Sequence, residues 1–124
     1  MPKQAQAKGV VEELPLSEPV FLILASLAPG PKHSYAILKE VAELSQGRVQ
    51  LSTGTLYGAI KRLLEDSWIQ RAPDPEPVNG NRERKSYALT PHGWRVLGAE
   101  SQRMQGLAEL ALQRMAGEAG HAPD

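Results

Sequence analysis

The chain has 124 residues, no cysteine, and 14 acidic and 14 basic residues, so its formal net charge at pH 7 is zero. This length fits one domain with one added element, and the absence of cysteine excludes disulfides and thiol chemistry. A neutral chain has no overall attraction to nucleic acid, so any basic surface must come from local segregation of charge.

Residues 1–13 are polar, and the first segment, residues 1–15, is expected to form a flexible arm, with a marginal helix as the alternative. Its first nine residues do not resemble a signal peptide. The longest apolar run, residues 20–27, is far shorter than the ~20 residues needed to span a bilayer. We therefore expect a cytoplasmic protein without membrane contact.

The first helix is predicted to begin near Ser17, which can cap it, with Glu18 and Pro19 in the first turn. The next residues, 20–27, are apolar except for Ser26. A helix that is apolar on nearly every side is buried on nearly every side. One small core can hardly cover it, so a second subunit is expected to help. Pro29, Gly30 and Pro31 end the helix.

A helix-turn-helix is predicted next, over residues 34–66. The first of its helices covers about residues 34–46 and ends at Gly47, a natural residue for the position just past a helix. Its expected inner face consists of Tyr35, Ile37, Leu38, Val41 and Leu44. A short link leads to Ser52, which can cap the second helix. Two helices joined by a short link that contains glycine match this motif.

The two faces of the helix after Ser52 differ in character. One face is apolar and consists of Leu56, Ile60, Leu63 and Leu64. The opposite face consists of Gly54, Tyr57, Gly58, Lys61 and Arg62. Each glycine costs the helix about 1 kcal/mol relative to alanine, and a partner that must come close to the backbone would offset this cost. A hydroxyl, an aromatic ring and a cation on one ridge suit DNA phosphates, although an ordinary surface helix is the alternative.

A β-hairpin with a long loop follows this helix. Residues 68–72 and 85–90 have strand character, and the second run alternates Tyr87 and Leu89 inward. The loop between them begins with three prolines and then contains the turn signal Asn79-Gly80. Its basic residues are Arg82, Arg84 and Lys85. Three helices and a hairpin in this order predict a mainly α fold with a small β-hairpin (α+β), namely a winged helix-turn-helix over residues 16–90.

The last helix is predicted over residues 91–116, with Thr90 as its cap and Pro91 in its first position. A heptad-like seam runs along it through Trp94, Leu97, Ser101, Met104, Ala108, Ala111 and Met115. Residues 91–115 would span about 37 Å, more than so small a domain can cover. We expect a dimerisation helix that pairs with its own copy; the alternative is a helix folded back on its own domain. Residues 117–124 are expected to be disordered.

Enzymatic chemistry has little support in the sequence. The three histidines, His33, His92 and His121, lack the spacing of metal ligands on a helix, and local hydrogen bonding is the simpler role. No glycine-rich phosphate loop follows a strand. We expect no catalytic residue, no metal and no cofactor.

Four short stretches in combination resemble the PadR family of bacterial transcriptional regulators. They are residues 33–37 (HSYAI), residues 51–57 (LSTGTLY), Arg62-Leu63, and residues 85–90 (KSYALT) with Gly93. The resemblance covers about residues 16–115 and is to the short subgroup with a single helix after the wing. It implies a homodimer that binds operator DNA, usually as a repressor. Ser67 stands where the family commonly has glycine, so the exit from the third helix is expected to be tighter or strained.

The expected DNA-binding residues are Ser52, Thr53, Gly54, Thr55, Tyr57, Gly58, Lys61, Arg62, Arg82, Arg84 and Lys85. The expected dimer interface consists of Phe21, Leu24, Trp94, Leu97, Met104, Leu107, Ala108, Ala111 and Met115. A two-fold dimer predicts an inverted-repeat operator. An apolar gap between the subunits is expected, which Leu110 would also flank. The resemblance implies that some family members admit a small aromatic or hydrophobic effector there. The alternative function is a winged helix that binds protein rather than DNA, which would not need the basic cluster.

Overall fold

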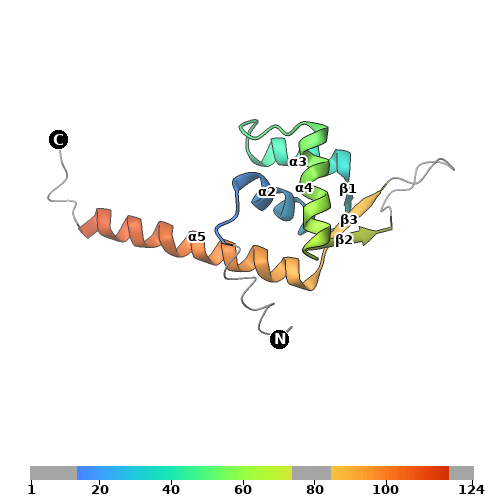
Figure 1. Cartoon of the computed structure of the whole chain (residues 1–124). Coiled ribbons are helices and arrows are strands. Elements are labelled where there is room, and N and C mark those ends of the chain that lie inside the picture. The colour runs from blue at the N-terminus through green and yellow to red at the C-terminus, as the bar shows by residue number, and fades with distance from the viewer. Residues whose placement is uncertain (1–13, 74–84, 118–124) are drawn as a thin grey trace.

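The computed structural model describes residues 14–73 and 85–117. In chain order the elements are α2 (Glu18–Leu27), β1 (Lys32–His33), α3 (Ser34–Leu44), α4 (Thr53–Glu65), β2 (Ile69–Ala72), β3 (Ser86–Leu89) and α5 (Pro91–Gly117) (Figure 1). The mainly α fold with a small sheet and a long last helix is confirmed. The predictions for residues 1–13, for the wing residues 74–84 and for the tail 118–124 lie outside the described residues.

The caps of α2 and α4 were predicted from the sequence, whereas the cap of α3 was not. Ser17 accepts a hydrogen bond from the N–H of Val20, and the Ser52 hydroxyl accepts one from the N–H of Thr55 at 3.1 Å. His33 caps α3, because its Nδ1 accepts from the N–H of Ala36 at 3.4 Å. Each cap satisfies a backbone donor that the first turn of a helix leaves free.

The sheet has three antiparallel strands in the order β1-β3-β2. The predicted hairpin is confirmed as β2 and β3, in which Ile69 is opposite Leu89 and Ala72 is opposite Ser86. The strand β1 was not predicted, because two residues are too few to show an alternating pattern. Its pairing of His33 with Ser86 attaches the start of α3 to the central strand.

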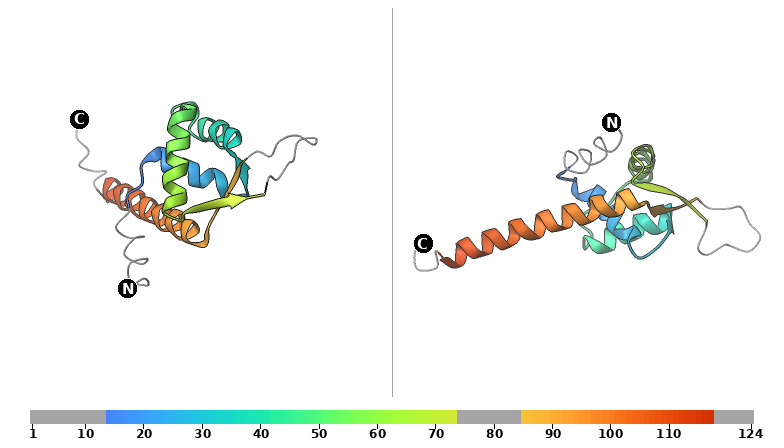
Figure 2. Two further views of the ribbon diagram at one scale, coloured as in Figure 1. Left: turned by 45° about the vertical axis from the view of Figure 1, so that its right-hand side comes forward. Right: turned by 90° about the horizontal axis from the view of Figure 1, so that it is seen from below.

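The core lies where α2, α3 and α4 meet the sheet and the first turns of α5 (Figures 1 and 2). Ile23, Leu24 and Leu27 are buried inside this one chain, so the expectation that a single core could not cover the first helix is wrong for them. The expected inner face of α3 is also partly wrong, since Tyr35 is 68% exposed and Leu44 is 50% exposed. The buried face of α3 is narrower and is centred on Ile37 and Val41.

Two helix ends use left-handed residues. After α3, both Gln46 (φ 56°) and Gly47 (φ 82°) are left-handed. The chain therefore reverses direction one residue earlier than the helix end that was predicted at Gly47. After α4, Ser67 takes φ 61°, a conformation that favours glycine, which confirms the predicted strain at this exit. The N–H groups of Ser67 and Trp68 satisfy the last carbonyls of the helix, those of Leu64 and Leu63.

The exit from α4 is joined directly to the start of α5. The carbonyl of Trp68 accepts from the N–H of Thr90 at 3.0 Å. The Thr90 hydroxyl donates to the carbonyl of Ser67 at 2.5 Å and accepts from the N–H of Gly93 at 2.9 Å. A Cβ atom on Gly93 would lie 2.0 Å from the Trp68 carbonyl oxygen. Only glycine allows the Trp68 carbonyl to come this close, and the contact fixes where α5 begins.

The last helix leaves the domain about halfway along its length. It contains 27 residues, which correspond to about 40 Å, and its second half extends away from the other elements (Figure 2). Every residue from Met104 to Gly117 is exposed in the single chain. In the described part of the chain, no helix is both long and apolar enough to cross a membrane.

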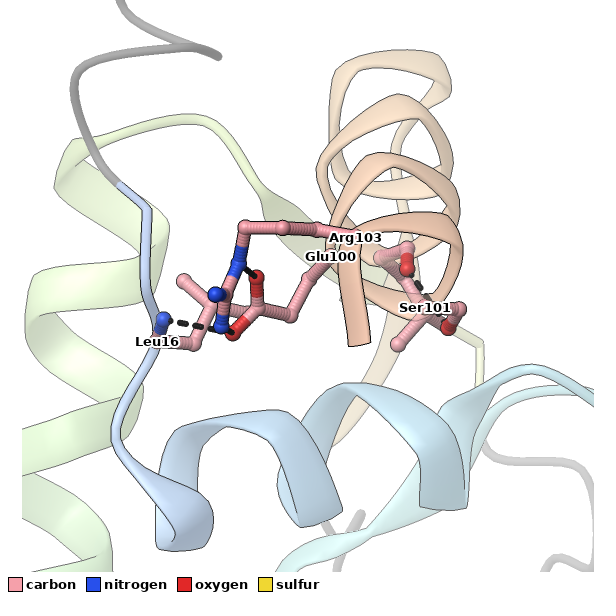
Figure 3. Close-up of polar contacts among 5 residues, drawn as sticks. Leu16, Glu100, Ser101 and Arg103 are labelled. Carbon is pink, nitrogen blue, oxygen red and sulfur yellow. Dashed lines mark hydrogen bonds and ion pairs between the residues drawn. The ribbon is translucent and has the colours of Figure 1, made fainter. Parts of the chain in front are cut away.

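An ion pair between a buried glutamate and a partly exposed arginine marks the point where α5 leaves the domain (Figure 3). Glu100 is 1% exposed and receives two hydrogen bonds from Arg103, at 2.6 and 2.9 Å. One of its oxygens also accepts from the backbone N–H of Leu16 at 2.9 Å. The hydrogen bonds from Arg103, and then that from Leu16, lower the pKa of the Glu100 carboxyl, although burial opposes them. The sequence analysis missed this residue, because its partner Leu16 is 84 residues away.

Replacement of Gly93 by alanine should destabilise the domain by about 1–3 kcal/mol, because the new Cβ must displace backbone. Gly98→Ala is the matched control, since a Cβ there meets nothing within 4 Å on the same helix. This control should gain up to about 1 kcal/mol of helix propensity. Urea unfolding followed by tryptophan fluorescence measures both. Equal shifts of the two midpoints would contradict the described junction.

Replacement of Glu100 by glutamine should make the free energy of unfolding depend less on pH in the acidic range. Because the pKa of Glu100 is lowered in the folded state, its contribution is present above its ordinary value of 4.5 and is lost as the pH falls through the folded-state pKa. The free energy of unfolding, measured between pH 3 and 7, should therefore depend less on pH in Glu100→Gln. Glu109→Gln, at an exposed position of the same helix, should retain the wild-type dependence; equal slopes in both variants would refute the role of Glu100.

Candidate nucleic-acid interface

The helix α4 presents a polar ridge to solvent and an apolar face to the core. Leu56, Ile60 and Leu63 are buried, and Leu64 is partly buried, as predicted. The exposed ridge consists of Thr53, Gly54, Thr55, Tyr57, Gly58, Lys61 and Arg62. Lys61 and Arg62 have no acidic partner within 4.0 Å among residues 14–73 and 85–117. The ridge therefore carries two cations in a chain with no net charge, and the exposed acids Glu65 and Asp66 follow at the end of the helix.

The exposed ridge of α4 has no side chain at either of its two glycines. A Cβ atom built on Gly54 or Gly58 would meet nothing within 4 Å, so packing inside the chain does not require glycine there. Both positions are open to solvent. Their small size leaves room for an external partner to approach the helix backbone.

Hydroxyl groups gather at the start of α4. The Ser52 hydroxyl accepts from the N–H of Thr55 and donates to the Thr55 hydroxyl at 2.9 Å. The hydrogen of the Thr55 hydroxyl therefore stays available to an outside acceptor. Together with the free N–H groups of a helix start, such a group suits an anion.

Tyr57 is tied to the neighbouring helix. Its ring is 52% exposed, and its hydroxyl lies 3.1 Å from the hydroxyl of Ser34, the first residue of α3. A hollow of about 230 Å³ lies here, lined by His33, Ser34, Tyr35, Tyr57 and Lys85. Only Tyr57 and Lys85 were predicted from sequence. The motif HSYAI pointed to the start of α3, but periodicity could not show that it meets α4.

The wing contributes one described basic residue to this surface. Lys85 is exposed at the beginning of β3, whereas Arg82 and Arg84 lie outside the described residues. On the other hairpin strand, the guanidinium of Arg71 lies over the Tyr87 ring, 6.0 Å from its centroid. Burial raises the pKa of the Tyr87 hydroxyl, although the nearby Arg71 charge opposes this. Tyr87 is therefore a core residue rather than a titrating group of the surface.

The predicted dimer residues separate into three groups. Phe21 and Met104 line one groove of about 330 Å³ between α2 and α5, together with Leu16, Glu18, Leu22, Glu100 and Arg103. Leu24 and Leu97 are buried in the core of their own chain, so they have little surface to offer a second subunit. The remaining predicted residues are exposed along α5: Trp94, Leu107, Ala108, Ala111 and Met115.

Comparison with known sequences identifies the family. A model described as the transcriptional regulator PadR-like family matches residues 23–99, more than half of the chain. An uncharacterised 37.1 kDa protein in transposon TN4556 of Streptomyces fradiae is 33% identical over 87 residues, 70% of this chain. Those residues are 23% of that relative, so the chain spans less than a quarter of its length.

Solved structures agree with this assignment. A PadR family transcription regulator from Clostridium difficile R20291 is 28% identical, with a TM-score of 0.66 over 80% of this chain and 99% of that one. Bacillus subtilis PadR in complex with operator DNA has the same fold, with 22% identity and a TM-score of 0.55 over 64% of this chain and 44% of that one. Residues 23–99, which the family model matches, include the sheet, α3, α4 and the inner turns of α5. The chain belongs to the PadR-like family of transcriptional regulators.

Proposed function

We propose that this protein is a homodimeric repressor that places α4 in the major groove of an inverted-repeat operator. The observation that carries the proposal is the division of α4 into a buried apolar face and an exposed ridge with Tyr57, Gly58 and Lys61. A B-DNA major groove admits a helix of this kind. The Bacillus subtilis relative with operator DNA supports the same use of the fold.

Phosphate contacts would hold the helix in register. The Thr55 hydroxyl and the start of α4 supply hydrogen-bond donors, and Lys61, Arg62 and Lys85 supply positive charge. In this proposal the wing residues Arg82 and Arg84 extend the contact along the backbone. Such contacts give affinity for any duplex, while the part of the α4 ridge that meets the base edges selects the sequence.

Dimerisation would cover the exposed half of α5. The apolar residues Met104, Leu107, Leu110, Leu112 and Met115 are exposed there in the single chain. So much exposed apolar surface on one projecting helix is typical of a protein interface. Two copies related by a two-fold axis would set their α4 helices about 34–36 Å apart, or a multiple of that distance.

A small aromatic or hydrophobic effector would enter through the groove between α2 and α5. Phe21, Leu22 and Met104 supply apolar surface beside the Glu100–Arg103 ion pair. Trp94 does not line this groove. The proposed effector site is therefore narrower than the gap expected from sequence.

Selection from a pool of random duplexes by the wild-type protein would test the DNA-binding proposal and supply the operator probe. We expect an inverted repeat. Gly58→Glu should abolish binding to that duplex with its thermal unfolding retained, because the new side chain adds bulk and negative charge at the ridge and its Cβ atom meets nothing within 4 Å. Gln102→Glu, which adds the same charge at an exposed position of α5, should bind normally.

Two results would refute this use of α4. One is a folded Gly58→Glu protein that binds the selected duplex as the wild type does. The other is a wild-type protein that enriches no duplex, which would favour the protein-binding winged helix instead.

Met104→Asp should dissociate the dimer and abolish operator binding. A charge without a partner in a closed interface costs several kcal/mol. Sedimentation at 10 µM should show a dimer for wild type and Gln102→Glu and a monomer for Met104→Asp. A monomeric wild type that still binds the selected inverted repeat would contradict the proposed architecture.

A further inference from the structure

We propose that Ser34, Tyr57 and Lys85 form a clamp for one phosphate of the DNA backbone, and that Ser34 positions Tyr57 in it. This inference rests on the proposed function and assigns a role to a residue of α3 that the sequence analysis did not single out. The clamp draws its residues from α3, from α4 and from the residue immediately before β3.

The geometry brings these side chains to one hollow. The hydroxyls of Ser34 and Tyr57 are 3.1 Å apart although the residues are 23 positions apart in the chain. Lys85 lines the same hollow of about 230 Å³, as do His33 and Tyr35. The pairing of His33 with Ser86, the residue after Lys85, holds the start of α3 beside this end of β3.

The chemistry of the hollow favours an acceptor-only partner. Two hydroxyls that share one hydrogen bond retain one hydroxyl hydrogen for an outside acceptor. The Lys85 ammonium carries three further donors. None of the five lining residues is acidic. A phosphate oxygen, which is negative and only accepts hydrogen bonds, matches these donors better than a base edge, which mixes donors and acceptors.

Ser34 acts on DNA through Tyr57 in this proposal. The Tyr57 ring is half exposed, so without a partner its hydroxyl would have to be ordered when DNA binds. A hydrogen bond to Ser34 fixes the hydroxyl in advance and lowers that ordering cost. The same bond links the two helices of the helix-turn-helix at their DNA-facing edge.

The experiment compares Ser34→Ala, Tyr57→Phe and the double variant on two probes, the duplex selected by the wild type and a scrambled duplex of equal length. Each single variant should lose about tenfold in affinity for both probes, the scale of a hydrogen bond to a charged group. The double variant should lose no more than either single one, because both changes break the same contact. Ser34→Thr keeps the hydroxyl and should bind as the wild type does.

The salt dependence separates the hydroxyls from the lysine. Lys85→Gln should lower the slope of log affinity against log salt by about 0.9 per monomer. The two hydroxyl variants should keep the wild-type slope, because they remove no charge. Unchanged thermal unfolding of the variants assigns the losses to the DNA contact rather than to folding.

Four results would overturn the clamp. They are unchanged affinity of Ser34→Ala, losses confined to the selected duplex, additive losses in the double variant, and an unchanged slope in Lys85→Gln. Tight binding of inorganic phosphate by the free protein, at matched ionic strength, would also overturn it by showing an anion site independent of DNA. All of these measurements require that the wild type binds its selected duplex. Failure of that binding refutes the proposed function itself.

Discussion

The contact between the Trp68 carbonyl and the first turn of α5 is the constraint on which the other elements depend. Gly93 lets the carbonyl approach, and Thr90 binds the backbone on both sides of the junction. The exit from α4, the start of the hairpin and the origin of α5 therefore share one point. Backbone groups on both sides make these contacts, so they fix the start of α5 against the exit from α4.

The inner turns of α5 pack against the core and its outer turns are exposed to solvent, and Glu100 lies at the boundary between them. Val96 and Leu97 are buried in the core, whereas residues from Met104 onward are exposed. A buried carboxylate is costly unless it is paired and hydrogen-bonded. Arg103 and the Leu16 N–H meet that need and hold the segment before α2 against α5. The groove between α2 and α5 is therefore built around this ion pair.

Much of the fold follows from local chemistry that the sequence states directly. Ser17, Ser52 and Thr90 can satisfy free N–H groups one turn away, so helix starts are visible in the sequence. The periodicity of α4 separates its buried face from its ridge, because both faces repeat within one helix. The strained exit at Ser67 was expected from the family resemblance alone, because Ser67 stands where relatives commonly have glycine.

Contacts between segments that are far apart in the sequence determine the remaining features of the fold. The strand β1 exists because β3 offers it an edge, and Glu100 is buried because Leu16 and Arg103 cover it. Leu24 is buried in its own core, and Tyr35 is exposed. Apolar character alone could not distinguish these two cases, because it does not say which neighbour will cover a side chain. Helix positions and the two faces of α4 are properties of the sequence, whereas the buried face of α3, the partners and the coverage depend on how the elements pack.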